Sequence, residues 1–104
     1  MSEHNNKAVA LLEVQANVAA IVGLDAMVKA ADVRLIHVER KLGGRLVTVV
    51  VDGTVSACEA AAEAGRIAAA AIGNVKLCEV IPSPHDEVLK FLYTDPLYET
   101  GEDA

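Results

Sequence analysis

The residues of this chain that could do acid–base, nucleophilic or metal chemistry are few and widely spaced. None of the three histidines has a serine or cysteine directly beside it as a nucleophile: His4, His37 and His85. Cys58 and Cys78 lack the CxxC spacing and the nearby histidine of a zinc site, and they fit reduced thiols used as small apolar side chains. We therefore expect no catalytic residue, no metal site and no cofactor.

The acidic residues and the glycines show no catalytic arrangement either. Asp86 and Glu87 adjoin the predicted start of a helix, where the helix dipole favours carboxylates. The sequence contains no phosphate-binding glycine loop and no HExxH metal motif. These observations argue against an enzyme.

The most distinctive polar segment is 41–46, which reads KLGGRL. It contains the only Gly-Gly pair of the chain, followed at once by Arg45. Glycine readily adopts the positive φ that tight reverse turns need. Taken locally, the segment predicts a hairpin turn with a solvated arginine at its tip.

Composition and charge limit the classes of protein that fit. The chain has 104 residues, 53% of them hydrophobic but only 3% aromatic, and a net charge of −6. Four acidic residues and no basic one follow Leu92, so the remainder is nearly neutral and has no basic stripe for nucleic acid. The longest apolar run, 67–72, is far shorter than the ~20 residues of a membrane span, and the polar start MSEHNN does not resemble a secretion signal. We expect a cytoplasmic protein that binds neither nucleic acid nor membrane.

The apolar patterns predict one domain at 7–92, between a flexible N-terminus at 1–6 and an acidic tail at 93–104. Its strands are expected at 7–14, 33–40, 46–51 and 75–81, its helices at 17–31 and 54–72, and a short helix at 85–92. This β-α-β-β-α-β order is typical of the ferredoxin-like α+β class, with a four-stranded antiparallel sheet and two helices on one face.

Details within these elements give further expectations. Asn17 and Thr54 are expected to cap the two helices. In the first helix Ile21, Leu24 and Val28 form an apolar stripe, and Asp25 and Lys29 are spaced for an i,i+4 ion pair. Strict alternation over 33–40 places His37 and Arg34 on opposite faces of their strand. The second helix carries nine alanines, so its own sheet and a neighbouring subunit can both approach it closely.

Four stretches resemble, in order and in register, the hexamer-forming single-domain shell proteins of bacterial microcompartments. They are DAMVKAADV at 25–33, KLGG with LVTVVVDGTV at 41–55, EAGRIAAAAIG at 63–73 and EVIPSPHDEV at 79–88. The resemblance implies a βαββαβ subunit, a flat six-fold homo-hexamer and tiling with other shell proteins. It also implies enclosed pathway enzymes, a central pore for small polar metabolites, and a place in the microcompartment shell in the bacterial cytoplasm.

The resemblance assigns the pore to the segment Lys41, Leu42, Gly43, Gly44 and Arg45, with Gly44 where the constriction is commonly lined. Arg45 departs from the family, which usually has a small residue there. We expect Arg45 either to rim the pore and favour anions, or to fold back onto an acidic neighbour.

The resemblance also assigns the edge at which hexamers meet to Asp25, Lys29, Asp32, Pro82, Ser83, Pro84 and His85. Lys29 matches the family's edge lysine, whereas Ser83 stands where an arginine is usual and Asp32 where an asparagine is common. Loss of a multidentate donor beside an added carboxylate predicts weak self-tiling and a minor role in a mixed shell. At the front of the first helix, Val14-Gln15-Ala16 replaces the family's Thr-Lys/Arg-Gly.

A second function shares the same fold. A ferredoxin-like regulatory domain that oligomerises and binds an effector at a subunit interface fits the same element order, because fold does not fix function. This interpretation predicts a discrete dimer or trimer with saturable ligand binding, whereas the shell-protein interpretation predicts a hexamer.

Overall fold

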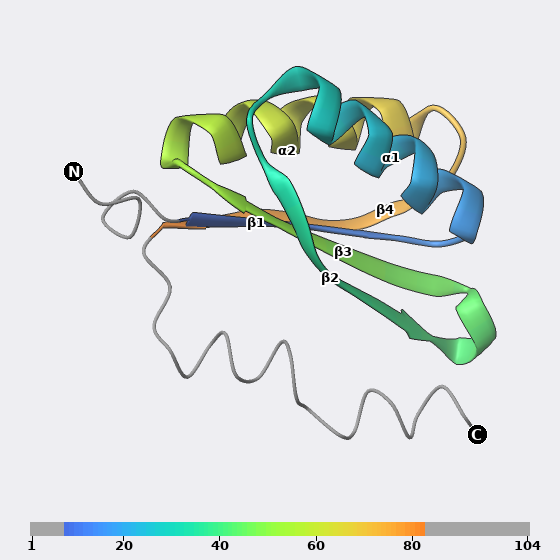
Figure 1. Cartoon of the computed structure of the whole chain (residues 1–104). Helices are drawn as coiled ribbons and strands as arrows, with labels where there is room; N and C mark the ends of the chain where they lie inside the picture. Colours follow the sequence, from blue (N-terminus) through green and yellow to red (C-terminus); the bar gives the residue numbers. More distant parts are fainter. Residues whose placement is uncertain (1–7, 83–104) are drawn as a thin grey trace.

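The computed structural model describes residues 8–82, which form an antiparallel sheet covered on one face by two helices (Figure 1). The elements, in chain order, are β1 (Ala8–Val14), α1 (Asn17–Ala30), β2 (Arg34–Lys41), a 3₁₀ turn (Leu42–Gly44), β3 (Leu46–Gly53), α2 (Val55–Ala70) and β4 (Val75–Pro82). The predicted order and the ferredoxin-like class are confirmed. The short helix expected at 85–92 and the two predicted terminal segments, 1–6 and 93–104, lie outside the described residues.

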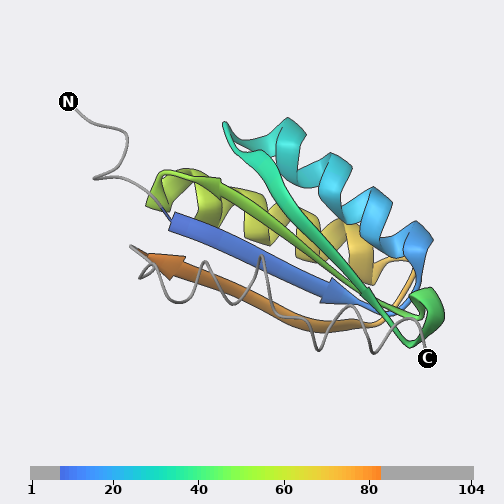
Figure 2. The same ribbon diagram turned by 60° about the horizontal axis from the view of Figure 1, so that its bottom comes forward.

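The sheet has the strand order β2-β3-β1-β4, with every neighbouring pair antiparallel. β1 therefore lies in the interior, paired with β3 on one side and β4 on the other. Its alternate residues Ala8, Ala10, Leu12 and Val14 are fully buried against the helices. Figure 2 shows α1 and α2 running side by side above this face. The residues of β1 that alternate with these four point to the opposite face of the sheet, because successive side chains of a strand point to opposite sides.

The two helices approach closely because glycines face each other between them. A Cβ built on Gly65 would lie 2.5 Å from Met27 Cγ and 3.2 Å from the Gly23 carbonyl oxygen. Met27, the side chain that such a Cβ would meet, is fully buried in the core cluster. Small side chains at this contact let the backbones meet, which explains why an alanine-rich, nearly aromatic-free sequence can still pack densely.

The apolar stripe predicted on α1 is not the face that this helix buries in the core. Ile21 and Val28 are 65% and 42% exposed, and Leu24 is only partly buried. The side of α1 that enters the core carries Ala19, Ala20, Gly23 and Met27. The spacing of the large residues does not indicate the buried face, because α1 lies so close to α2 that the contact accepts mainly small side chains.

The predicted alternation along β2 is also wrong. The register against β3 shifts between Leu35 and His37, which inserts one extra residue at Ile36. Arg34, opposite Asp52, and His37, opposite Val50, consequently lie on the same face of the sheet. This is the face away from the helices.

The two predicted helix caps have different outcomes. Thr54 caps α2 as expected, since its Oγ1 accepts a hydrogen bond from the Ala57 N–H at 3.1 Å. Asn17 is not the cap of α1: it is the first helical residue, and Ala16 occupies the cap position without any side-chain hydrogen bond. The Asn17 side chain is engaged elsewhere.

Candidate functional site

The loop between β2 and β3 is a 3₁₀ turn built from three consecutive residues with positive φ. Leu42, Gly43 and Gly44 have φ values of 57°, 68° and 87°. Glycine adopts such values without steric cost, whereas for leucine they are unusual. Leu42 is 56% exposed, so its side chain lies on the surface. The hairpin predicted at KLGG is confirmed, with one more left-handed residue than the two glycines alone suggested.

Arg45 folds back over this loop. Its backbone N–H and its Nε both donate to the carbonyl oxygen of Leu42, at 3.3 Å and 3.0 Å. The fold-back partner is thus a carbonyl group and not the carboxylate named in one of the two expected arrangements. Arg45 remains exposed, so this bond orients the guanidinium on the loop surface. Among residues 8–82, no carboxylate forms an ion pair with it.

Lys41, the last residue of β2, points to the helix-free face of the sheet. Its Nζ lies 3.7 Å from Glu13 Oε2, and the same oxygen accepts a hydrogen bond from Thr48 Oγ1 at 2.8 Å. Glu13 and Thr48 are direct partners across β1 and β3. The side chain of Lys41 is 26% exposed. This network ties the start of the loop to the interior strands.

Beside the loop is an open hollow of about 460 Å³ lined by Gln15, Ala16, Gly44 and Arg45. Ala16 has φ 101° and ψ 138°, a conformation that is essentially restricted to glycine. The turn from β1 into α1 is therefore strained where it faces the loop.

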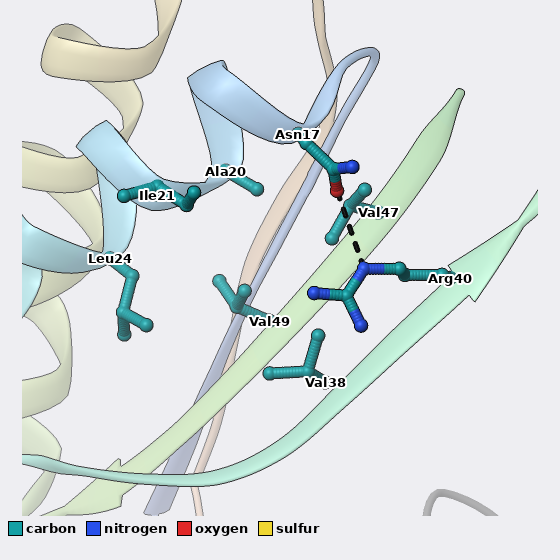
Figure 3. A pocket seen from close by; sticks show the side chains of 8 residues that line it. All are labelled: Asn17, Ala20, Ile21, Leu24, Val38, Arg40, Val47 and Val49. Atoms are coloured by element: carbon teal, nitrogen blue, oxygen red, sulfur yellow. Dashed lines mark hydrogen bonds between the residues drawn. The ribbon is translucent and has the colours of Figure 1, made fainter. Parts of the chain in front are cut away.

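A smaller groove of about 90 Å³ runs between α1 and the strands β2 and β3 (Figure 3). Its walls are apolar, with Ala20, Ile21 and Leu24 from α1 facing valines of the sheet. At one end Arg40 Nε donates to Asn17 Oδ1 at 3.3 Å, so an exposed polar link spans the groove (Figure 3). The sequence suggested Asn17 only as a helix cap and did not single out Arg40, because nothing in the spacing of the two residues indicates that they meet.

The predicted edge residues that fall in the described part are all exposed. Asp25 and Lys29 form the expected i,i+4 ion pair at 3.0 Å on α1. Asp32 lies in the turn between α1 and β2, and Pro82 ends β4. Ser83, Pro84 and His85 lie outside the described residues. The structure of one chain does not bring the α1 group and the β4 end into a shared contact, so any joint role needs further copies.

The described residues, 8–82, contain no group of acidic, histidine or cysteine side chains that could hold a metal ion. Within the same range no helix is long and apolar enough to cross a membrane. Cys58 and Cys78 are free thiols, as predicted. Burial raises the pKa of both, helped at Cys58 by the nearby Asp52 carboxylate. Both therefore stay protonated and weakly nucleophilic at neutral pH.

A family model described as the BMC domain matches residues 8–84, which include the whole sheet and both helices. The chain belongs to this family of bacterial microcompartment shell proteins. It is 48% identical over 86 residues to the bacterial microcompartment shell protein PduA of Citrobacter freundii, covering 83% of this chain and 91% of that protein. It is 45% identical over 82 residues to the shell protein EutM of Escherichia coli K12, covering 79% and 84%.

Among solved structures, the fold of this shell protein matches a microcompartments protein from Desulfitobacterium hafniense DCB. The TM-score is 0.72 at 30% sequence identity. The match covers 84% of this chain and 47% of that chain, so this chain spans about half of it. The resemblance seen in the sequence is confirmed, and the protein is a structural subunit of a bacterial microcompartment shell.

Proposed function

We propose that this shell protein forms a cyclic homo-hexamer that tiles with other shell proteins around encapsulated enzymes. A central pore in the hexamer passes small polar metabolites. The role is structural and needs neither catalysis nor a cofactor.

The observation that carries this proposal is the set of large apolar side chains that one chain leaves exposed on both helices and on β2. Six of them are more than a third exposed: Val18, Ile21, Val22, Val28, Leu35 and Ile67. Ile72, in the turn just after α2, is exposed as well. Monomeric proteins seldom expose so many on so small a domain, and contact with identical neighbours would bury them. This supports assembly through α1 and the β2 edge, and a further contact along α2.

We place the pore at the loop formed by Lys41, Leu42, Gly43, Gly44 and Arg45. The loop connects β2 to β3 and forms the tip of this hairpin, at one end of the sheet (Figure 1). Gly43 and Gly44 present backbone without side chains, and Arg45 adds a charge oriented by the Leu42 carbonyl. Six such charges around one axis would create a positive potential although the whole chain is acidic. The pore would therefore favour anionic metabolites.

The hexamer edge is proposed to comprise Asp25, Lys29, Asp32 and the segment 82–85. Lys29 is engaged by Asp25 within one helix turn, so its use at an edge requires exchange of that exposed and weak pair for an intersubunit contact. Asp32 adds negative charge nearby.

Light scattering on the purified protein tests the assembly directly. A particle of about six times the chain mass of 10.9 kDa supports the proposal. A stable dimer or trimer that also binds one small molecule saturably would contradict it and would support the regulatory-domain alternative. The relatives described above are shell proteins, which favours the hexamer.

A further inference from the structure

The loop that follows β2 has few contacts outside its own hairpin. Among the described residues and apart from chain neighbours, a Cβ built on Gly43 would meet no heavy atom within 4 Å. One built on Gly44 would meet a single atom, Nδ2 of Asn17, at 3.5 Å. The two hydrogen bonds from Arg45 to the Leu42 carbonyl oxygen lie within the loop. They fix its local shape, but they do not fix its orientation relative to the helices.

Asn17, the first residue of α1, reaches both sides of this loop. Where the chain enters the loop, its Oδ1 accepts a hydrogen bond from Arg40 Nε at 3.3 Å (Figure 3). Where the chain leaves the loop, its Nδ2 lies beside Gly44. The guanidinium of Arg40 can only donate, so the amide oxygen of Asn17 faces Arg40 and the NH₂ group is left to face Gly44. We call these two contacts the Asn17 link.

Both ends of the Asn17 link start from ordered backbone. Arg40 pairs with Val47, which is buried against the helices, so the side chain of Arg40 points toward α1. The next residue, Lys41, points to the opposite face. Asn17 already has helical backbone. Ordered backbone at both ends limits the conformational entropy that is lost when the link forms.

We propose that Asn17 is a positioning residue for the loop 41–45, whose two glycines it holds in one orientation relative to α1. Positive φ at three consecutive residues, one of them a leucine, persists only where the surroundings favour it. Among the described residues, Asn17 supplies the one side chain beside Gly44 from outside the hairpin. The effect on the pore rests on the function proposed above, whereas the Asn17 link itself is a property of one chain.

A nitroxide spin label on the loop tests the proposal. In a Cys78→Ser background, Leu42→Cys offers an attachment site, because Leu42 is 56% exposed whereas Cys58 is fully buried. Labelling with the nitroxide and an excess of its diamagnetic analogue keeps labels on neighbouring copies from interacting. Asn17→Ala and Arg40→Ala should each shorten the rotational correlation time of the label by about twofold, because each breaks the link. Combining them should add little, since both remove the same contact.

A conservative variant and matched controls separate positioning from a general loss of structure. Asn17→Asp keeps the oxygen that accepts from Arg40, so the label should remain as slow as in the wild type. Ser56→Ala, in the first turn of α2, and Arg66→Ala, also on α2, should have no effect. A second label at Glu59→Cys, exposed on α2, should report no change in any variant. The proposal is overturned if the loop label ignores Asn17→Ala, if the Glu59→Cys label changes equally, or if Asn17→Asp behaves as Asn17→Ala.

Phosphate binding distinguishes this proposal from the proposed pore. If Arg45 attracts anions there, Asn17→Ala should weaken binding of inorganic phosphate by about threefold, because the charge remains but is less well oriented. A wild type that binds no phosphate, with the label responding as expected, would contradict the selectivity of the pore and support the positioning role. Phosphate binding that depends on Arg45, together with a loop label that ignores Asn17→Ala, would support the pore and refute the positioning role.

Discussion

At the scale of single residues, Arg45 owes its position to the backbone of the loop. Positive φ at Leu42 turns that carbonyl so that it accepts from both the backbone N–H and the Nε of Arg45. The guanidinium is then fixed beside glycines that cannot shield it. This arrangement could not be predicted from the sequence, because it depends on a leucine adopting a conformation that leucine rarely adopts.

Arg45→Ala should weaken binding of inorganic phosphate to the assembled protein by about tenfold, or about 1.4 kcal/mol, because the proposed ring of positive charge is lost. Isothermal titration calorimetry at low salt measures this. The matched control is Arg66→Ala, which removes an exposed arginine of α2 that is paired with Glu63. Equal phosphate affinity in wild type and Arg45→Ala would remove Arg45 from the proposed selectivity of the pore.

Ala16 is a second residue whose backbone conformation determines what a substitution would do. A non-glycine residue at φ 101° and ψ 138° is strained by about 1–3 kcal/mol, whereas glycine accepts this conformation. Ala16→Gly should therefore raise the free energy of unfolding by about 1 kcal/mol after the entropic cost of glycine. Urea denaturation checks this.

The control for Ala16 is Ala71→Gly at the end of α2, where φ is −69° and alanine is unstrained. There glycine should lower the free energy of unfolding by about 0.5–1 kcal/mol. If both substitutions destabilise the protein alike, Ala16 is not strained. The family's glycine at this position, set against Ala16 here, was the one sequence signal of this feature.

At the scale of elements, the contact between α1 and α2 depends on Gly65. Alanine is favoured over glycine in a helix by about 1 kcal/mol, but a Cβ at Gly65 would meet Met27 Cγ at 2.5 Å. Overpacking typically costs 1–3 kcal/mol, so Gly65→Ala should lower the free energy of unfolding by about 1–2 kcal/mol. The substitution should cost less in a Met27→Ala background, and a double-mutant cycle by urea denaturation measures that coupling. Additive effects would contradict the proposed steric cause.

The order of the elements was predictable, whereas the faces they present were not. Strands such as 46–51 and the alanine-rich helix at 54–72 carry strong local signals, and Thr54 caps its helix as its type suggests. The orientation of α1 depends on which residues fit against α2, so Ile21 lies outside and Gly23 inside. The bulge at Ile36 leaves no mark in the alternation of β2 and appears only through the register with β3. Long-range packing decided each of these features.

At the scale of the whole molecule, charge at the proposed edge should decide whether hexamers tile. Asp32 is exposed in the turn after α1, and like charges that face each other across a seam oppose association. Ser83 offers one hydroxyl where the family has the planar, multidentate donor of arginine. The wild type should therefore form few extended sheets by itself.

Asp32→Asn combined with Ser83→Arg should restore both family features and promote sheets at physiological salt, visible by negative-stain electron microscopy and sedimentation. Adding Lys29→Ala should abolish those sheets, because it removes the edge lysine itself. The control Glu59→Gln removes one exposed negative charge from α2 and should leave assembly as in the wild type. Extended sheets from the unmodified protein would show that Asp32 and Ser83 do not weaken the edge. A double variant that stays as separate hexamers would place the tiling contacts elsewhere on the subunit.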